Sequence, residues 1–301
     1  MAAEKYSRNF LRGFTSDGYC SEGLGYWNYG FGHYVLLAET IRQATDGGVD
    51  LLARPEVRAP ATFPARIAII GNVYPAFADC SINTRPAPDI MFFLNRVLGL
   101  GLKEYAELDL SWVVGNLPEA LIFAFPNAAT QAPLPQAEAG PGLRSWFDQA
   151  GVLIGRPQPG SQCQLGVALK GGHNAEHHNH NDVGSYVVVV KDKAVLLDPG
   201  RETYTARTFS SRRYESKLLN SFGHPVPVVA GKLQRPGKDA RAVVVRTEFT
   251  DAEDTLVLDI SRAYDVPELR KLQRTFIYSR KGTGALVVTD EVEFSSPQTF
   301  E

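Results

Sequence analysis

Apolar side chains recur at every third or fourth position across residues 24–42, the spacing that places them on one face of an α-helix. The repeat is formed by Trp27, Phe31, Val35, Ala38 and Ile41. Tyr26, Tyr29 and His33 fall on a neighbouring face of the same helix, which is left for a cleft if the first face is core. The pattern therefore predicts one helix with a buried stripe and an aromatic stripe beside it.

Proline and glycine divide the rest of the first half into shorter helical segments. We expect these helices at about 63–70, 89–98, 103–109 and 117–123. The segment 126–142 is rich in Pro, Ala and Gly and has no apolar period, as is typical of a linker or exposed connection. A boundary between two parts of the chain is expected there.

Short alternating or β-branched runs replace the helical pattern after this boundary. They occupy 163–170, 184–192, 194–198, 225–231, 241–249, 255–264, 269–279 and 284–294. Such runs predict an antiparallel β-sandwich of at least seven strands. The expected fold is thus α+β, with a helical part at 1–125, a linker at 126–142 and a sandwich at 143–301. Because the last run stops without a capping segment, we expect the sandwich to be incomplete at that end.

Charge and cysteine content exclude several classes of partner and site. The 301 residues carry 31 basic and 33 acidic side chains, a formal charge of −2, so nothing global favours nucleic acid or an anionic membrane. Cys20, Cys80 and Cys163 form no CxxC pair, which argues against a disulfide scaffold or a cysteine zinc site and leaves one bridge open. No run of 18 apolar residues occurs, and the first residues lack the apolar core of a signal peptide, so membrane insertion is not expected.

The segment "GHNAEHHNHNDVGSY", residues 172–186, holds four of the six histidines. On an extended backbone, the i, i+2 pair His178 and His180 would project from one face, about 6–7 Å apart at Cα. Asp198 ends a predicted buried strand before a Pro–Gly turn, and His224 opens another strand. Two imidazoles and a carboxylate suit zinc or another borderline divalent ion, so His180, Asp198 and His224 are the candidate ligands. The alternative is a hydrogen-bonded turn of histidines and asparagines without metal.

Two further groups of side chains are candidates for a role in binding or chemistry. Tyr26 and Tyr29 are core residues, sugar-stacking rings, or an acid or base whose phenol is activated by a neighbouring cation. The second group lies between Asp198 and His224, and its guanidinium groups could bind carboxylate or sulfate in bidentate fashion. It comprises Tyr204, Arg207, Arg212, Arg213 and Tyr214. The alternative for this group is solvated surface.

Four motifs together resemble the heparinase II/III-like polysaccharide lyases and span most of the chain. The segment 177–200, "HHNHNDVGSYVVVVKDKAVLLDPG", is similar to that family's order of catalytic His, metal His two positions later, strand start and DPG turn. The segment 223–234, "GHPVPVVAGKLQ", is similar to the family's "HNTVLVDGKGQ", with Pro225 and Val226 replacing Asn and Thr. "DGYCSEGLGYWNYG" resembles the family's tyrosine helix, and "YPAFADCS" resembles a later turn of its toroid.

The resemblance implies a partial (α/α) toroid followed by an antiparallel β-sandwich, and β-elimination on a uronic-acid polysaccharide. A base removes the C5 proton once the C6 carboxylate is neutralised, and an acid protonates the leaving O4. By match, His178 would be the catalytic histidine, Tyr26 or Tyr29 the catalytic tyrosine, with Tyr26 preferred, and Tyr204 or Tyr214 with the arginines would orient the uronate. His180, Asp198 and His224 would hold a mainly structural Zn²⁺.

The same resemblance implies an acidic polysaccharide as partner and a periplasmic or secreted location. The sequence leaves the oligomeric state open, with a homodimer as one option. One feature departs from the family: its charge-neutralising helix lies about fifty residues before the tyrosine helix, and only some twenty-five residues precede Tyr26. We therefore expect this chain to be a fragment of a longer lyase. Two alternatives stay open, namely a non-catalytic, metal-stabilised protein that binds acidic glycans, and a cupin-like catalytic metal site.

Overall fold

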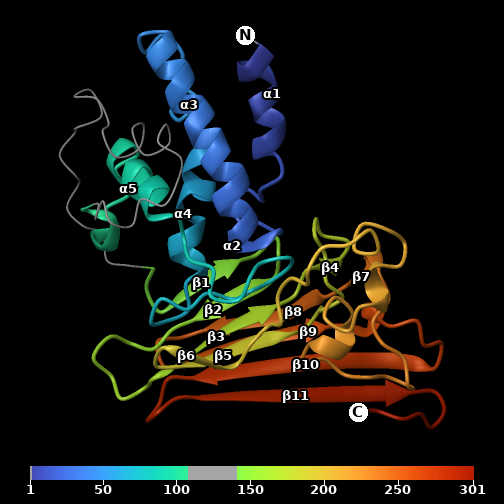
Figure 1. Cartoon of the computed structure of the whole chain (residues 1–301). Coiled ribbons are helices and arrows are strands. Elements are labelled where there is room, and N and C mark those ends of the chain that lie inside the picture. The colour runs from blue at the N-terminus through green and yellow to red at the C-terminus, as the bar shows by residue number, and fades with distance from the viewer. Residues whose placement is uncertain (1, 108–140) are drawn as a thin grey trace. The chain divides into compact units, whose positions relative to one another are not determined.

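The computed structural model describes residues 2–107 and 141–301, which fall into two compact units (Figure 1). The first unit comprises Met1–Cys20, Leu24–Ala65 and Arg85–Pro141, and the second comprises Ser21–Gly23, Arg66–Thr84 and Gly142–Glu301. The segment 66–84 thus groups with the second unit, whereas the sequence suggested a helical part over 1–125. The helix expected at 117–123 and nearly all of the linker expected at 126–142 lie outside the described residues.

The first unit is helical, and the longest predicted helix is confirmed. It runs through α2 (Gly23–Tyr26), a π-helical turn (Trp27–Phe31) and α3 (Gly32–Ala44). The predicted apolar stripe is buried throughout, and the Trp27 indole donates a hydrogen bond to the Pro60 carbonyl at 2.8 Å. The apolar repeat therefore fixes which face of this helix enters the core.

The remaining helices are shorter, as the proline and glycine punctuation predicts. They are α1 (Ala2–Leu11), α4 (Arg58–Ile67), α5 (Pro88–Val97) and two 3₁₀ turns (Pro55–Val57 and Lys103–Tyr105). Pro88 occupies the first turn of α5, where a missing N–H costs no helical hydrogen bond. In the described part of the chain, no helix is both long and apolar enough to cross a membrane.

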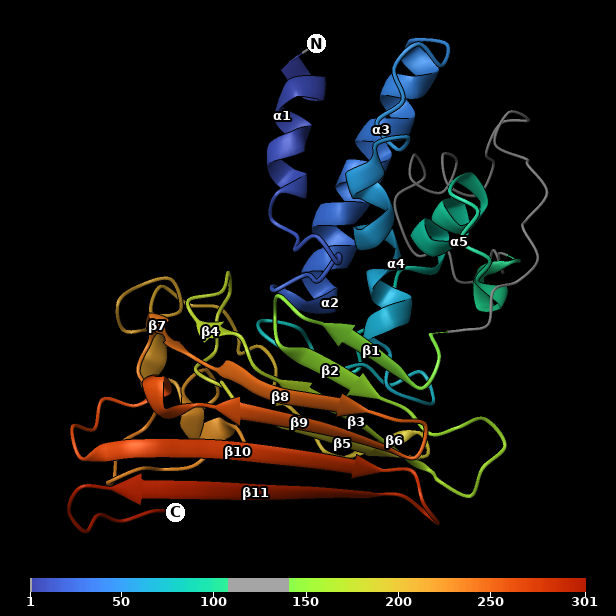
Figure 2. The ribbon, with the colours of Figure 1, turned by 180° about the vertical axis from the view of Figure 1, so that it is seen from behind.

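The second unit is built around two antiparallel sheets. The five-stranded sheet has the order β1-β2-β3-β5-β6 and the four-stranded sheet has the order β11-β10-β9-β8, while β4 and β7 form a separate pair (Figure 2). The strands of the first sheet are β1 (Arg144–Phe147), β2 (Val152–Gly155), β3 (Leu165–Lys170), β5 (Tyr186–Val190) and β6 (Lys193–Leu196). The others are β4 (His173–Asn174), β7 (Gly237–Arg241), β8 (Val243–Phe249), β9 (Glu253–Asp259), β10 (Leu269–Ser279) and β11 (Ala285–Phe294).

Apolar side chains from both sheets form one core, as a sandwich requires. Leu153 and Val167 enter it from the five-stranded sheet, and Leu256 and Phe276 enter it from the four-stranded sheet. A Cβ on Gly155 of β2 would lie 2.6 Å from the Tyr278 ring, so the missing side chain lets this aromatic residue pack against the strand. The predicted sandwich is therefore present.

One predicted strand, 225–231, is wrong. Only Val229 of this segment forms isolated bridges, to Lys232 and Phe300. Pro225 and Pro227 lack the N–H groups that a continuous ladder needs. Two further strands, β1 and β2, arise from short segments that the alternating pattern did not reveal.

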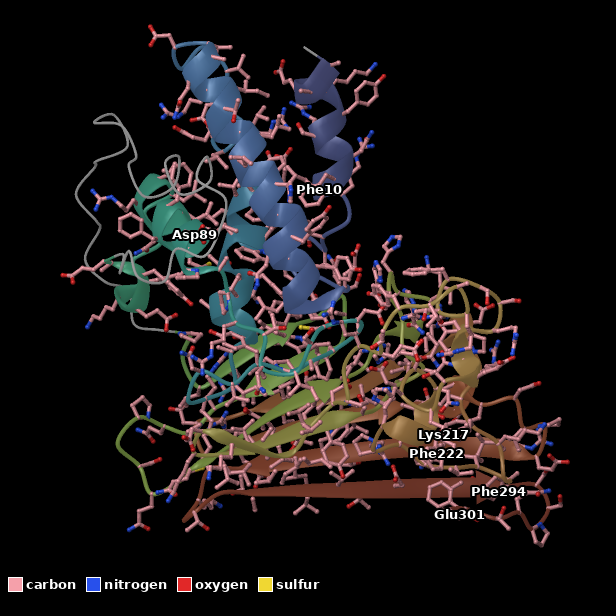
Figure 3. The ribbon with its side chains drawn as sticks, in the orientation of Figure 1. Phe10, Asp89, Lys217, Phe222, Phe294 and Glu301 are labelled. Atoms are coloured by element: carbon pink, nitrogen blue, oxygen red, sulfur yellow. The ribbon has the colours of Figure 1, made fainter. Side chains whose placement is uncertain are left out.

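A long connection follows β6 and carries several candidate residues. It contains two 3₁₀ turns, Arg213–Glu215 and Ser221–Gly223. The Lys217 ammonium lies 4.8 Å from the centroid of the Phe222 ring, and the two side chains are adjacent in Figure 3. All three cysteines of the chain are buried.

Buried ion pairs connect the two sheets of the sandwich. The Asp254 carboxylate of β9 is fully buried and accepts hydrogen bonds from Arg144 of β1 and from Arg280, which follows β10. Arg280 also donates to the carbonyls of Arg156 and Leu143 at 2.6 and 2.8 Å. This cluster therefore joins β1 of one sheet to β9 and the end of β10 of the other sheet through charged hydrogen bonds.

We expect Asp254→Ala to lower the free energy of unfolding by about 3–5 kcal/mol, because it leaves a buried guanidinium uncompensated. Glu291→Ala is the control, since Glu291 belongs to an exposed pair with Lys271 and such pairs contribute about 0.2–1 kcal/mol. Urea denaturation of both variants measures the difference. Equal losses would contradict the assignment of Asp254 as a buried link between the sheets.

Candidate functional site

The histidine-rich segment forms a loop between β4 and β5, so the extended backbone considered for His178 and His180 is not present there. His178 lies in a turn with a φ of 53°, a left-handed conformation that is uncommon for residues other than glycine. Hydrogen bonds anchor the loop: the Asp182 amide donates to the Asn174 side chain at 3.2 Å, and the Val183 amide donates to the Gln234 side chain at 3.0 Å. These hydrogen bonds fix the backbone conformation of the loop.

Asp79, from the turn 74–81, brings His178 and His180 together. Its Oδ2 lies 2.8 Å from Nδ1 of His178, and its Oδ1 lies 3.1 Å from Nε2 of His180. The Arg213 guanidinium donates to Oδ1 at 2.8 Å, and the Tyr204 hydroxyl donates to Oδ2 at 3.1 Å. Two histidines, an arginine and a tyrosine thus share one carboxylate.

The Asp79 carboxylate is buried and ionised. Burial by itself opposes ionisation, but hydrogen bonds from His178, His180 and Arg213 outweigh it and hold the pKa of Asp79 well below its usual range. On the other side of His178, Nε2 lies 3.8 Å from Oε2 of Glu22. The imidazole of His178 is therefore flanked by two carboxylates.

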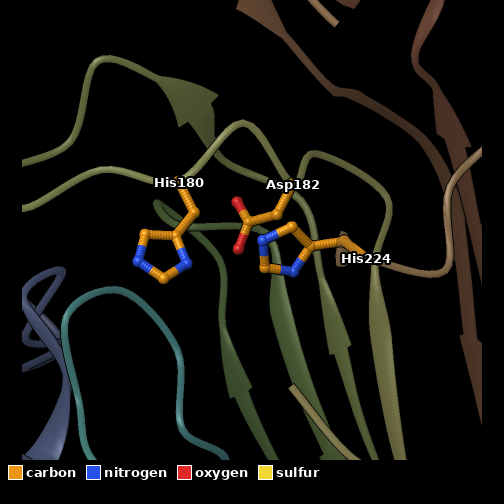
Figure 4. Close-up of side chains that lie close together, drawn as sticks. All are labelled: His180, Asp182 and His224. Atoms are coloured by element: carbon orange, nitrogen blue, oxygen red, sulfur yellow. The ribbon is translucent and has the colours of Figure 1, made fainter. Parts of the chain in front are cut away.

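A second cluster next to these residues can hold a metal ion. The side chains of His180, Asp182 and His224 offer ligand atoms that all lie within 4.8 Å of one another. The Asp182 carboxylate lies between the two imidazole rings (Figure 4). Lys170 also contacts this carboxylate, with Nζ 2.6 Å from Oδ1.

The unsatisfied atoms of the cluster fit a cation. Nδ1 of His180 and Nε2 of His224 are buried and have no hydrogen-bond partner within residues 2–107 and 141–301. Unpaired nitrogen atoms at such depth are costly unless a ligand takes their lone pairs. The other nitrogen of each ring contacts a carboxylate, Asp79 for His180 and Asp198 for His224. This carboxylate–histidine arrangement orients metal-binding imidazoles in many proteins.

Asp198, a predicted ligand, lies against His224 and outside the compact group of three. Its Oδ2 is 3.1 Å from Nδ1 of His224, and its Oδ1 accepts a hydrogen bond from the Gly200 amide at 2.9 Å. Burial opposes the charge of Asp198, yet His224 and His180 lower its pKa. Burial likewise opposes the charge of His224, and Asp198 outweighs this and raises the pKa of the imidazole.

Each of the three candidate arginines is paired with a carboxylate. Arg207 contacts Glu202 at 2.6 Å, Arg212 contacts Glu215 at 2.8 Å, and Arg213 contacts Asp79. The Arg212 pair is on the exposed surface, whereas Arg213 is mostly buried beside His178 and His180. The arrangement brings Arg213 to the histidines and leaves Arg212 at the surface.

The two candidate tyrosines of this connection make different contacts. Tyr204 reaches both Asp79 and the His178 ring, with its hydroxyl 3.5 Å from Nδ1. Tyr214 accepts a hydrogen bond from the Asn179 amide group at 3.0 Å, and burial raises its pKa. Of the two, only Tyr204 contacts His178 directly among the contacts of the described residues.

Tyr26 and Tyr29 belong to the first unit, Tyr26 directly before the π-helical turn and Tyr29 within it. Tyr26 ends α2, and Tyr29 lies inside the turn with 67% of its surface exposed. The Tyr29 ring lies 4.6 Å from the His33 ring. Single π-helical turns are frequent at functional sites, and a catalytic role for either phenol stays a prediction.

Sequence reasoning missed Asp182 and Lys170 as members of the site and gave Asp79 no role in catalysis. Asp182 lies within the histidine-rich segment and Asp79 lies within the "YPAFADCS" motif. Both residues are therefore part of motifs that the sequence analysis had identified. Lys170 ends β3 and carries no motif. Its burial beside Asp182 is visible only in the folded chain.

Solved structures with the same fold include heparinase III and the heparan sulfate lyase HepC from Pedobacter heparinus. The heparinase III structure has a TM-score of 0.65 and 18% identity, covering 98% of this chain and 43% of that one. HepC has a TM-score of 0.65 and 14% identity, covering 98% of this chain and 41% of that one. The chain thus spans less than half of either structure. At these identities the likeness concerns the fold, and the predicted partial toroid followed by a sandwich is confirmed.

A search among curated proteins gave no match. Residues 140–301 match the family described as "Heparinase II/III-like, C-terminal", and this range includes the whole sandwich and the histidine-rich loop. The match covers more than half of the 301 residues. The chain therefore belongs to the heparinase II/III-like family.

Proposed function

We propose that this chain is part of a polysaccharide lyase that cleaves a uronic-acid-containing polysaccharide by β-elimination, with His178 as its catalytic histidine. The observation that carries the proposal is the hydrogen bond between Nδ1 of His178 and the buried Asp79 carboxylate. An ionised carboxylate only accepts hydrogen bonds, so Nδ1 carries the proton and the lone pair of the neutral ring is on Nε2. Such an imidazole is prepared to take up a proton at Nε2.

The chemistry of β-elimination explains the residue types. Removal of the C5 proton leaves an electron pair that forms the C4–C5 double bond, while the C4–O4 bond breaks and O4 receives a proton from an acid. The uronate carboxylate must be neutralised for C5–H to become acidic. We propose that Tyr26, with Tyr29 as the alternative, supplies the catalytic phenol that acts together with His178. The residues that orient the uronate are then Tyr204 or Tyr214, together with Arg207, Arg212 and Arg213.

We infer that the cation at His180, Asp182 and His224 is Zn²⁺, with a mainly structural role. Imidazole nitrogens with a carboxylate are a common zinc donor set. Asp198, the predicted ligand, orients His224 through Nδ1 or completes the ligand set. A bound zinc ion would fix the loop that carries His178, two positions from His180.

The family and one named neighbour support an acidic polysaccharide as the substrate to propose. One solved neighbour is a heparan sulfate lyase, and an acidic glycosaminoglycan is therefore the first substrate to test, with alginate-like polymers as the next. Polymers of this kind are met outside the cytoplasm, so we propose a periplasmic or secreted location. A homodimer stays a proposal to be tested by sedimentation.

Incubation of the protein that carries this chain with heparan sulfate, chondroitin sulfate or alginate should raise the ultraviolet absorbance through the new C4–C5 double bond. We expect His178→Ala to lower the initial rate by about 10²- to 10⁴-fold, the usual contribution of a positioned acid or base. His177→Ala is the matched control, because His177 is the exposed neighbour of His178. No absorbance rise with any polymer, together with saturable binding, would support the non-catalytic alternative.

Zinc should stabilise the protein through His180 and His224. At a free Zn²⁺ concentration of 100 times the dissociation constant, the free energy of unfolding should rise by about 2.7 kcal/mol. We expect His180→Ala and His224→Ala to abolish this gain in calorimetric melts and His177→Ala to retain it. An equal gain in all three variants would contradict the metal site.

The affinity for zinc should increase with pH. Because the pKa of His224 is raised above its ordinary value of 6.5, the metal-free imidazole keeps its proton at and above that pH, and this proton must leave before Nε2 can bind a cation. Titrations between about pH 6 and 8 should therefore show tighter binding at the higher pH. An affinity that is constant over this interval would contradict the raised pKa.

A further inference from the structure

We propose that Asp79 is a positioning residue that sets the orientation and the tautomer of His178 and His180 at the same time. The inference rests on the proposed function in two respects, because it calls His178 catalytic and takes His180 as a Zn²⁺ ligand. The Asp79 carboxylate couples the metal cluster, through His180, to the neighbouring His178. Asp79 itself has no role in bond making or breaking here.

The Asp79 carboxylate has no freedom to rotate. Each oxygen receives two donors: Oδ2 contacts His178 and Tyr204 at 2.8 and 3.1 Å, and Oδ1 contacts His180 and Arg213 at 3.1 and 2.8 Å. A carboxylate has about four lone-pair positions, so these donors fill them. The side chain has no exposed surface, so water does not compete for these positions.

The two histidines must adopt opposite tautomers as a result. His178 presents Nδ1 to Asp79 and therefore carries its proton there, whereas His180 presents Nε2 and carries its proton at that atom. The lone pair of His180 is thus on Nδ1, the buried nitrogen without a hydrogen-bond partner in the described ranges. One anion prepares Nε2 of His178 to accept a proton and Nδ1 of His180 to bind a metal.

The backbone on both sides of this contact is held in an unusual conformation. Ala78, directly before Asp79, has a φ of 57°, and His178 has a φ of 53°. Non-glycine residues with such values persist where surrounding contacts fix them, and they cluster at functional sites. The DPG turn supplies one such contact, because the Arg201 amide donates to the Cys80 carbonyl at 3.0 Å.

The close approach of the DPG turn also explains its glycine. A Cβ at Gly200, which has a φ of 64°, would lie 2.3 Å from the Cys80 carbonyl oxygen. Only glycine allows this turn to pack against the segment that carries Asp79. The position of Asp79 therefore depends on the same turn that carries Asp198, the partner of His224.

The inference is tested by long-range ¹H–¹⁵N NMR of histidine-labelled protein, which reports which ring nitrogen is protonated. In the metal-free protein with neutral imidazoles, we expect the Nδ1–H tautomer for His178 and the Nε2–H tautomer for His180. We expect Asp79→Asn to abolish the single tautomer of His178 and to weaken Zn²⁺ binding by about 10- to 100-fold, the usual effect of removing a group that orients a metal ligand.

Asp290→Asn is the matched control, since Asp290 is a largely buried carboxylate paired with Arg274 on β10. It should leave both tautomers and the zinc affinity within about twofold of the unaltered protein. The inference is overturned if unaltered protein shows Nε2–H at His178, or if Asp79→Asn keeps the tautomers and the affinity. The NMR measurement of the His178 tautomer uses the unaltered protein, so it tests the inference even if Asp79→Asn does not fold. The tautomer and the zinc-affinity measurements do not depend on lyase activity. Absence of that activity would overturn only the proposed lyase function.

Discussion

A buried carboxylate that accepts hydrogen bonds from two histidines is the interaction on which this site depends. Asp79 contacts His178 and His180 through different oxygens, and Arg213 balances its charge. Burying a single anion in this position would be unfavourable without these donors. The same hydrogen bonds that stabilise the buried Asp79 carboxylate also orient the imidazoles of His178 and His180.

The elements that meet at Asp79 come from distant parts of the second unit. The turn 74–81, the histidine-rich loop and the connection after β6 converge there, and the sandwich provides the scaffold on which they are mounted. Functional residues often lie on loops that a rigid scaffold positions. The ion pairs of Asp254 and the core between the sheets stabilise that scaffold without entering the site.

Periodic elements could be predicted from the sequence, and the geometry of the site could not. The apolar repeat over 24–42 and the runs that became β3, β5, β10 and β11 identify their elements, because burial of one face leaves a local pattern. The contact between His178 and Asp79 joins residues 99 positions apart. No local pattern encodes such a distance, and the extended backbone considered for His178 and His180 is a loop in the folded chain.

The choice of metal ligands shows the same limit. Spacing and resemblance indicated His180, Asp198 and His224, and all three lie close together in the folded chain. The folded chain adds Asp182, whose carboxylate lies between the two rings (Figure 4). Boundaries of the helical and sandwich parts stay a proposal, since the segment 108–140 lies outside the described residues.

Anomalous diffraction at the zinc edge, from crystals grown with Zn²⁺, tests the central claim most directly. If Asp79 and Asp198 orient the two rings as described, a single peak should lie about 2.0–2.2 Å from Nδ1 of His180 and from Nε2 of His224. Asp79 should remain hydrogen-bonded to both His178 and His180. A peak at Nε2 of His180, or no peak in this cluster at saturating zinc, would contradict the account.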